Sequence, residues 1–139
     1  MDVTLDPTTI DLLRAVEEPE IETCAAPGAT RHRTIIWVVV DEHDRVFIRS
    51  VRGAQARWYR EALAQPAAVL HAEGLAIDVS VTPATDPERI AACSRWILSK
   101  YAGQYSARAM VAVHTLETTL QLVPRRAVPA SVRYPVPHG

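Results

Sequence analysis

Cysteine is scarce in this sequence of 139 residues, and the two cysteines do not stand at metal-ligand spacing. Cys24 and Cys93 form no CxxC pair and have no accompanying histidine at the spacing of a ligand set. Because free cysteine behaves as a small apolar residue, we expect both side chains in the core. The sequence therefore predicts no metal site.

A long apolar run is also lacking. The longest one, residues 35–40, is far shorter than the about 20 residues that a membrane-spanning helix needs. Asp2 and Asp6 stand where a secretory signal would carry lysine or arginine ahead of an apolar segment. We therefore expect a cytoplasmic protein without a membrane partner.

Aromatic residues make up only 6% of the chain, and no GxGxxG or GxxxxGKS loop occurs. The second absence removes the usual sequence signatures of dinucleotide-binding and P-loop proteins. The shortage of aromatic residues leaves few side chains on which bases could stack. With a formal net charge of -1, the sequence makes nucleic-acid binding the last of the functions that we consider.

Arginine, in contrast, is abundant and unevenly distributed. Fourteen of the fifteen basic residues are arginine, and Lys100 is the exception. Residues 1–30 contain seven acidic side chains and a single basic one, Arg14, whereas residues 31–60 contain seven arginines and three acidic side chains. This local positive charge is the feature that calls for an explanation.

The spacing of apolar residues predicts one α+β domain over residues 1–123, mainly antiparallel β, followed by a Pro- and Arg-rich tail over residues 124–139. Aspartate followed by proline predicts helix starts at Asp6 and Asp86. A third helix is expected over residues 54–65. Strands are predicted at residues 21–25, 34–40, 45–51, 67–72, 75–82 and 116–123. Five or six such strands favour a small barrel or rolled sheet with flanking helices, and the tail is either mobile or extended against a partner subunit.

Residues 34–51 are typical of a hairpin. The β-branched run 34–40 is too apolar for an edge, so it predicts a central strand that is buried on both faces. Residues 45–51 alternate, as a strand beside a core does. Pairing across a turn at residues 41–45 gives four opposed pairs: Val40 with Val46, Val38 with Ile48, Ile36 with Ser50, and Thr34 with Arg52.

At its open end this hairpin predicts an anion site. The pairing brings Arg31 and Arg33, which we expect in a loop, beside Arg52 and Gly53, where the next helix begins. The first N–H groups of a helix lack partners and guanidinium groups match phosphate oxygens, while glycine lets the backbone approach closely. Two alternatives stay open: an exposed basic rim, and neutralisation of the arginines by a carboxylate of the acidic N-terminal region.

The stretch RTIIWVVVDEHDRVFIRSVRGAQARWYREALAQP resembles the strand-strand-helix core of the FMN-binding split-barrel fold. It is most similar to the deazaflavin-dependent nitroreductase-like branch and to an uncharacterised family close to it. In those proteins a basic loop precedes a strand, the next strand ends in a Ser/Gly/Lys segment, and a helix begins with Trp-Tyr. Here these features correspond to residues 31–33, residues 50–53 and the pair Trp58-Tyr59. The likeness covers residues 30–82 well and the later part of the chain more loosely.

This resemblance implies a split β-barrel homodimer that binds a phosphate-bearing cofactor, either FMN or the 8-hydroxy-5-deazaflavin coenzyme. By position, the phosphate or ribityl contacts would be Arg31, Arg33, Ser50, Arg52 and Gly53. Trp37 and Trp58 would be candidates to wall the pocket. The sequence departs from the family pattern at residues 29–33, which replace a Gly-Arg-Lys-Ser-Gly type of loop, and at Arg49, where a small residue is common.

We expect an oxidoreductase that acts on a small molecule, because a flavin supplies the redox chemistry and needs no Ser-His-Asp set. Catalytic residues are not assigned. The alternative is a non-catalytic ligand-binding or sensor module of the same fold that has lost the cofactor. Among the histidines, His32 is placed to assist an anion site, whereas His71 and His114 are interpreted as structural groups.

Overall fold

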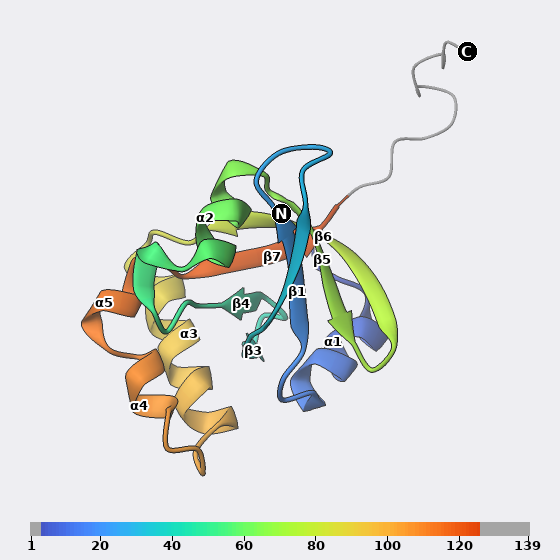
Figure 1. Ribbon diagram of the computed structural model, residues 1–139. Helices are drawn as coiled ribbons and strands as arrows, with labels where there is room; N and C mark the ends of the chain where they lie inside the picture. Colours follow the sequence, from blue (N-terminus) through green and yellow to red (C-terminus); the bar gives the residue numbers. More distant parts are fainter. Residues whose placement is uncertain (1–3, 126–139) are drawn as a thin grey trace, which may run out of the picture.

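The computed structural model describes residues 4–125 of the chain (Figure 1). Its strands are β1 (Glu20–Cys24), β2 (Arg31–Ile35), β3 (Val38–Val40), β4 (Val46–Ile48), β5 (Ala67–Ala72), β6 (Leu75–Pro83) and β7 (Leu120–Pro124). Its helices are α1 (Pro7–Ala15), α2 (Arg57–Ala64), α3 (Pro87–Lys100), α4 (Ala107–Met110) and α5 (Val113–Leu116), with a 3-10 turn η1 (Gly53–Gln55) ahead of α2. Within these residues, the seven strands form one antiparallel sheet in the order β2-β1-β5-β6-β7-β4-β3.

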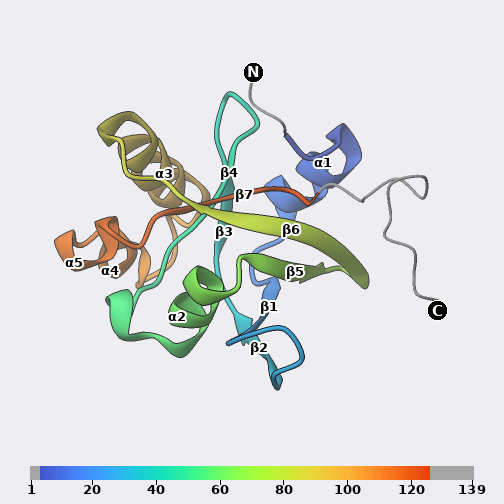
Figure 2. The same ribbon diagram turned by 90° about the horizontal axis from the view of Figure 1, so that it is seen from above.

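The sheet curls into a split barrel. Its two end strands, β2 and β3, lie farthest apart in the strand order, yet only Ile36 and Trp37 separate them in the chain. Because so short a link spans at most about 11 Å, the two edges of the sheet lie near each other. Figure 2 shows α3, α4 and α5 on one side of the strands and α1 on the other. The predicted split barrel with flanking helices is therefore confirmed.

The starts of α1 and α3 lie where the sequence predicts them. Asp6 Oδ1 accepts a hydrogen bond from the backbone N–H of Thr9 at 2.8 Å, and Asp86 Oδ2 accepts one from the N–H of Arg89 at 3.0 Å. In both helices a proline follows the capping aspartate, where its missing N–H costs nothing. The predicted β5–β6 hairpin also forms, with Ala67 opposite Ser80.

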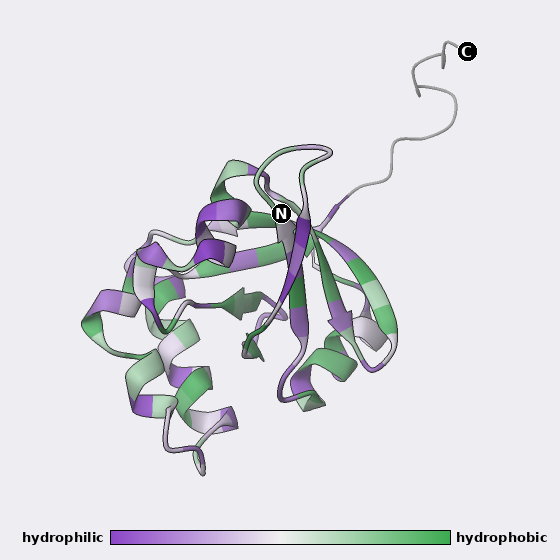
Figure 3. Cartoon of the chain, in the orientation of Figure 1, coloured by the Kyte–Doolittle hydropathy of each residue, from purple (hydrophilic) through white to green (hydrophobic). Residues whose placement is uncertain are grey.

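Apolar side chains form two clusters, one on each face of the β3–β4 pair, and Figure 3 shows the green apolar segments on these strands. The face turned toward α1, α2 and the other strands carries Val38, Val40, Val46 and Ile48. The opposite face carries Val39 and Phe47, which belong to the same cluster as Cys93 of α3. The register Val38–Ile48 and Val40–Val46 is as predicted, and both cysteines are buried.

The single strand predicted over residues 34–40 is wrong. The structure has two strands, and β2 extends back through Arg31 and Arg33, which we expected in a loop. β2 pairs with β1, with Arg33 opposite Glu22, so no ladder joins Thr34 to Arg52. The number of strands is therefore seven rather than five or six within residues 4–125.

The expectation that the apolar run is a central strand is also wrong, because β3 lies at the edge of the sheet. Its carbonyl groups are nevertheless satisfied. Lys100 Nζ donates to the carbonyl of Val38 at 2.7 Å, and Arg14 Nη1 donates to that of Val40 at 3.4 Å. An apolar strand can stand at this edge because both of its faces are buried and side-chain donors cover its edge.

The last strand begins later than predicted, because residues 113–119 form α5 and a turn rather than the start of a strand. Thr118 Oγ1 donates to the carbonyl of Thr115 at 2.6 Å and Thr119 Oγ1 donates to that of Leu116 at 2.8 Å. Such local bonds compete with strand pairing. The predicted tail lies, from residue 126 onward, outside the described residues. Over residues 4–125, no helix is both long and apolar enough to cross a membrane.

Candidate functional site

The loop between β4 and α2 is held in place by the segment around α5. The backbone N–H of Ser50 donates to Thr118 Oγ1 at 3.0 Å, and Ser50 Oγ donates to the carbonyl of Gly53 at 2.8 Å. His114 Nε2 donates to the carbonyl of Val51 at 2.9 Å. Ser50 and Gly53, both predicted site residues, are therefore buried parts of a rigid junction.

Gly53 is required by its conformation and by a close neighbour. Its φ is +80°, a left-handed value that side chains disfavour. A Cβ at this position would lie 3.3 Å from Cδ2 of His114. We predicted that this glycine permits a close approach of the backbone, and in the structure the group that approaches is His114.

Arg49, the first residue after β4, was not predicted as a site residue, and the structure places it in the interior at 2% exposure. Its guanidinium donates to four neutral acceptors: Thr119 Oγ1, Ser94 Oγ and the carbonyls of Ile90 and Met110. Within residues 4–125 it has no carboxylate partner, and burial lowers its pKa. Arg49 and Phe47 are two residues apart in an alternating stretch of the sequence, which indicates that both side chains point to the same face. That face carries the apolar cluster of Val39, Phe47 and Cys93.

A cavity of about 340 Å³ opens between β2 and this junction, and we call it the anion cavity. It is lined by residues 34–35, 50–52 and 56–58. Three predicted site residues meet here: Ser50, Arg52 and Trp58. Arg57, an exposed residue that was not predicted for the site, also lines it.

The anion cavity carries positive charge that the described protein does not neutralise. Within residues 4–125, neither Arg52 nor Arg57 forms an ion pair or donates a side-chain hydrogen bond. Arg57 is the first residue of α2, and Ala56 is its N-cap residue. Because alanine offers no side-chain acceptor, the N–H groups of the first turn have no side-chain cap. Guanidinium groups beside a helix N-terminus form a suitable donor set for a phosphate.

Arg31 and Arg33 do not line the anion cavity, so the predicted convergence with Arg52 is not found. Arg31 forms an ion pair with Glu22, and Arg33 Nε donates to Glu20 Oε1 at 2.8 Å. Both acids lie on β1, the strand that pairs with β2. For these two arginines the structure shows the alternative that the sequence left open, neutralisation by carboxylates of the N-terminal region.

The two predicted tryptophans have different surroundings. Trp37 stacks on Tyr101 with ring centroids 3.9 Å apart and planes inclined by 2°, on the side of the second apolar cluster. Trp58 is 7% exposed, lines the anion cavity and meets Tyr59 edge-on at 6.1 Å. Of the two, only Trp58 lies against the anion cavity.

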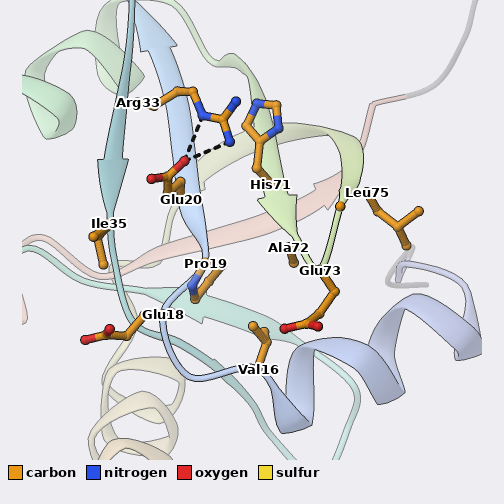
Figure 4. A pocket seen from close by; sticks show the side chains of 11 residues that line it. Val16, Glu18, Pro19, Glu20, Arg33, Ile35, His71, Ala72, Glu73 and Leu75 are labelled. Carbon is orange, nitrogen blue, oxygen red and sulfur yellow. Dashed lines mark hydrogen bonds and ion pairs between the residues drawn. The ribbon is translucent and has the colours of Figure 1, made fainter.

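A second cavity, of about 480 Å³, lies on the other side of Ile35, and we call it the hairpin cavity (Figure 4). It is lined by residues 16, 18–20, 33, 35 and 71–75. Arg33 and Glu20 form one wall, and His71, whose Nε2 is 2.6 Å from Glu22 Oε1, stands beside them. Ile35 lines both cavities, so they are neighbours along the end of β2.

Solved structures share this fold at low sequence identity. The conserved hypothetical protein Rv2991 from Mycobacterium tuberculosis matches with a TM-score of 0.63 and 14% identity, over 90% of this chain and 84% of that one. An F420-H2 dependent reductase, FDR-A, matches with a TM-score of 0.57 and 12% identity, over 88% of this chain and 99% of that one. HutZ, the heme storage protein from Vibrio cholerae, matches with a TM-score of 0.59 and 12% identity, over 89% of this chain and 92% of that one. At these identities the likeness shows the fold alone.

The sequence of the chain, in contrast to its fold, matches one protein family. No curated protein matches the chain at a significant level. Residues 9–122 match the family described as "Uncharacterized protein conserved in bacteria (DUF2255)". This match spans most of the chain and every residue that lines the two cavities. The chain therefore belongs to the DUF2255 family, on a split-barrel fold.

Proposed function

We propose that this protein binds a flavin-type cofactor through its phosphate in the anion cavity and acts as an oxidoreductase on a small molecule. The observation that carries the proposal is the pair Arg52 and Arg57, which have no acidic partner within the described residues and stand at the uncapped start of α2. A phosphate there would receive charge-assisted hydrogen bonds and would relieve the repulsion between the two guanidiniums.

The chain's own residues would bind and orient the cofactor. Arg52, Arg57 and the first N–H groups of α2 would hold the phosphate, and Trp58 would wall the cavity. The loop from Ser50 to Gly53 would keep these donors in place, because His114 and the threonines after α5 restrain it. The bound cofactor would supply the redox chemistry.

Arg31 and Arg33 have a smaller share in this proposal. Each would have to exchange its carboxylate on β1 for the ligand. The Arg33–Glu20 ion pair is exposed and can open at little cost, whereas Glu22, the partner of Arg31, is half-buried and also contacts His71. Trp37 has a packing role, because it is stacked on Tyr101.

The choice between FMN and the deazaflavin coenzyme is guided by the neighbours. FDR-A, a protein of the same fold, is described as a reductase that depends on F420-H2, which favours the deazaflavin coenzyme. HutZ, also of this fold, is described as a heme storage protein, so the fold accommodates more than one kind of cofactor. We therefore propose the deazaflavin coenzyme first and FMN second.

We also propose a homodimer. Ile35 and Val51 line the anion cavity at 59% and 39% exposure, and a second copy of the chain would cover these apolar side chains. Light scattering of the purified protein should give twice the mass of one chain, and a monomeric mass at micromolar concentration would refute this.

The test of cofactor binding is a parallel titration with the deazaflavin coenzyme and FMN, followed by cofactor absorbance and fluorescence. The double change Arg52→Ala and Arg57→Ala should weaken binding by about a hundredfold, because two charge-assisted contacts are lost. Arg108→Ala is the matched control, because Arg108 is an exposed arginine far along the chain at α4. It should bind like the unchanged protein.

Equal binding by the double variant and the control would refute the placement of the phosphate. Protein that ignores both cofactors, but whose melting temperature rises with inorganic pyrophosphate, would support the alternative of a non-catalytic module that binds a phosphorylated ligand. Circular dichroism of each variant should match that of the unchanged protein, since neither arginine is part of the core.

A further inference from the structure

The hairpin cavity combines an apolar floor with charged walls. Its volume, about 480 Å³, lies in the range of small-molecule sites. Pro19 and Ala72 are buried in its floor, Val16 is half-buried, and Ile35 is 59% exposed at its boundary with the anion cavity. Ligand binding would be favoured by burial of the accessible apolar surface of Val16 and Ile35, above the floor that Pro19 and Ala72 already close.

The charges on its walls are not balanced. Arg33 is paired with Glu20, and His71 with Glu22. Glu18 and Glu73 also line the cavity, and within residues 4–125 neither carboxylate has a hydrogen-bond or ion-pair partner. In Figure 4 these two side chains lie on either side of Pro19 and Val16, opposite the wall formed by Arg33 and His71. One side of the cavity is therefore negative, and the other is internally neutralised.

The position of Glu73 is unusual for a glutamate. It has a φ of +51° and is followed by Gly74 at +81°, a hairpin turn in which Asn, Asp or Gly is the common first residue. A larger side chain in this left-handed conformation costs backbone energy. The turn thus holds a carboxylate at the cavity where the hairpin alone would favour a smaller residue.

We propose that the hairpin cavity binds a small organic cation with a flat apolar body. Its amine or amidine group would lie beside Glu18 and Glu73, and its apolar body would lie against Pro19, Ala72 and Ile35. Because Ile35 separates this cavity from the anion cavity, a molecule bound here lies next to the proposed cofactor site. Resting on the proposed function, an amine-bearing molecule of this kind is the substrate class of the enzyme.

The test uses the full chain without cofactor and three probes of one shape: benzamidine, benzamide and benzoate, which are cationic, neutral and anionic. Two-dimensional NMR of 15N-labelled protein follows the amide signals of Ile35, Ala72 and Gly74. Benzamidine should shift these signals saturably at concentrations up to about 10 mM, and the other two probes should bind at least about tenfold more weakly.

Charge-neutralising variants then test the two carboxylates. Glu18→Gln and Glu73→Gln should each weaken benzamidine binding about threefold, and the double variant about tenfold. Glu117→Gln is the matched control, because Glu117 is exposed and lies outside both cavities, and it should change nothing. Equal affinity for the three probes, unshifted signals at all three amides, or unchanged affinity of the double variant would each overturn the proposal.

The outcome is separate from the test of the cofactor. Benzamidine binding is measured without any flavin, so failure of the cofactor titration leaves a positive result here as a ligand site without its proposed role as a substrate site. Conversely, cofactor binding through Arg52 and Arg57 would stand if benzamidine did not bind.

Discussion

The two edges of the curled sheet are treated by this protein in opposite ways. At β3, both faces are buried, and Lys100, Tyr101 and Arg14 donate hydrogen bonds to its carbonyl groups. At β2, the side chains alternate between exposed and half-buried, and its arginines are paired with acids of β1 on the surface. One edge is closed by the protein itself, and the other borders both cavities.

Basic side chains at the two edges therefore have different partners. On the β3–β4 side, Lys100 and Arg49 satisfy backbone and hydroxyl acceptors in the interior. On the β2 side, Arg33 balances Glu20 in an exposed ion pair. Arg31 balances the half-buried Glu22 and donates to Cys24 Sγ at 3.4 Å. Between the edges, Arg52 and Arg57 do neither within the described residues, and this is why we place the ligand there. A count of arginines along the sequence cannot separate these three situations.

The largest effect should come from Arg49→Ala. The change removes four hydrogen bonds and leaves a cavity between β4 and helices α3 and α4, so the free energy of unfolding should fall by about 2–5 kcal/mol in urea titrations. Arg49→Met fills most of the space without a buried charge, so its free energy of unfolding should fall by less. A loss below about 1 kcal/mol for Arg49→Ala would show that the β3–β4 side does not depend on this guanidinium.

Gly53→Ala comes next, because it strains the junction between the two sides. The left-handed φ of +80° and the 3.3 Å approach to His114 both oppose a methyl group, so we expect a loss of about 2–3 kcal/mol. Gly74→Ala is a matched control, since its φ is +81° but nothing lies within 4 Å of the new Cβ. If both variants lose the same amount in thermal unfolding, His114 does not restrain the loop.

Lys100 should give the closed edge a pH dependence. Burial lowers its pKa from 10.5 to about 8, so between these values the unfolded chain binds more protons than the folded one. Stability contributed by Lys100 is therefore complete above pH 10.5 and is lost as the pH falls through 8. Solvent screens a partly exposed amine, so we expect a gain below about 1 kcal/mol between pH 7.5 and 9.5.

The measurement for Lys100 is urea unfolding at both pH values, with Lys100→Met as the comparison. The variant should lack the gain that the unchanged protein shows. Burial raises the pKa of Tyr101, and this opposes stability only at higher pH, where the tyrosine of the unfolded chain ionises. If the free energy of unfolding changes equally with pH in both proteins, Lys100 is not the titrating group.

Arg33→Ala should have the smallest effect. Its ion pair with Glu20 is exposed, so the loss of unfolding free energy should stay below about 1 kcal/mol and should vanish at high salt. Chemical denaturation at low and high ionic strength tests this. A loss as large as that of Arg49→Ala would remove the contrast between the two edges.

The sequence predicts those parts of the fold that depend on local signals. Aspartate and proline mark both helix starts, and alternation identifies β5 and β6. It fails at residues 31–33, because Arg-His-Arg has no apolar alternation and becomes a strand through pairing with β1. It fails again at Thr118, where hydroxyl bonds to the backbone replace the strand that the spacing favours.

The candidate site is predictable to a similar extent. Arg52 was identified because the end of the hairpin and the helix start are adjacent in the sequence, whereas Ser50 and Trp58 were named through the family resemblance. The pairing of Arg31 with Glu22 depends on which strand lies beside β2, and a single sequence does not contain that information. The burial of Arg49 is a tertiary effect, since helices α3 and α4 supply its acceptors.

The two-residue link between the edges has a mechanical consequence. Ile36 and Trp37 are too few to absorb a displacement of β2, and the Trp37 ring lies flat on Tyr101, whose hydroxyl is anchored to the carbonyl of Glu17 at 2.6 Å. Any ligand or subunit that pulls β2 outward would therefore have to part these stacked rings. The contact between Trp37 and Tyr101 therefore tethers the open edge to the helical side of the molecule.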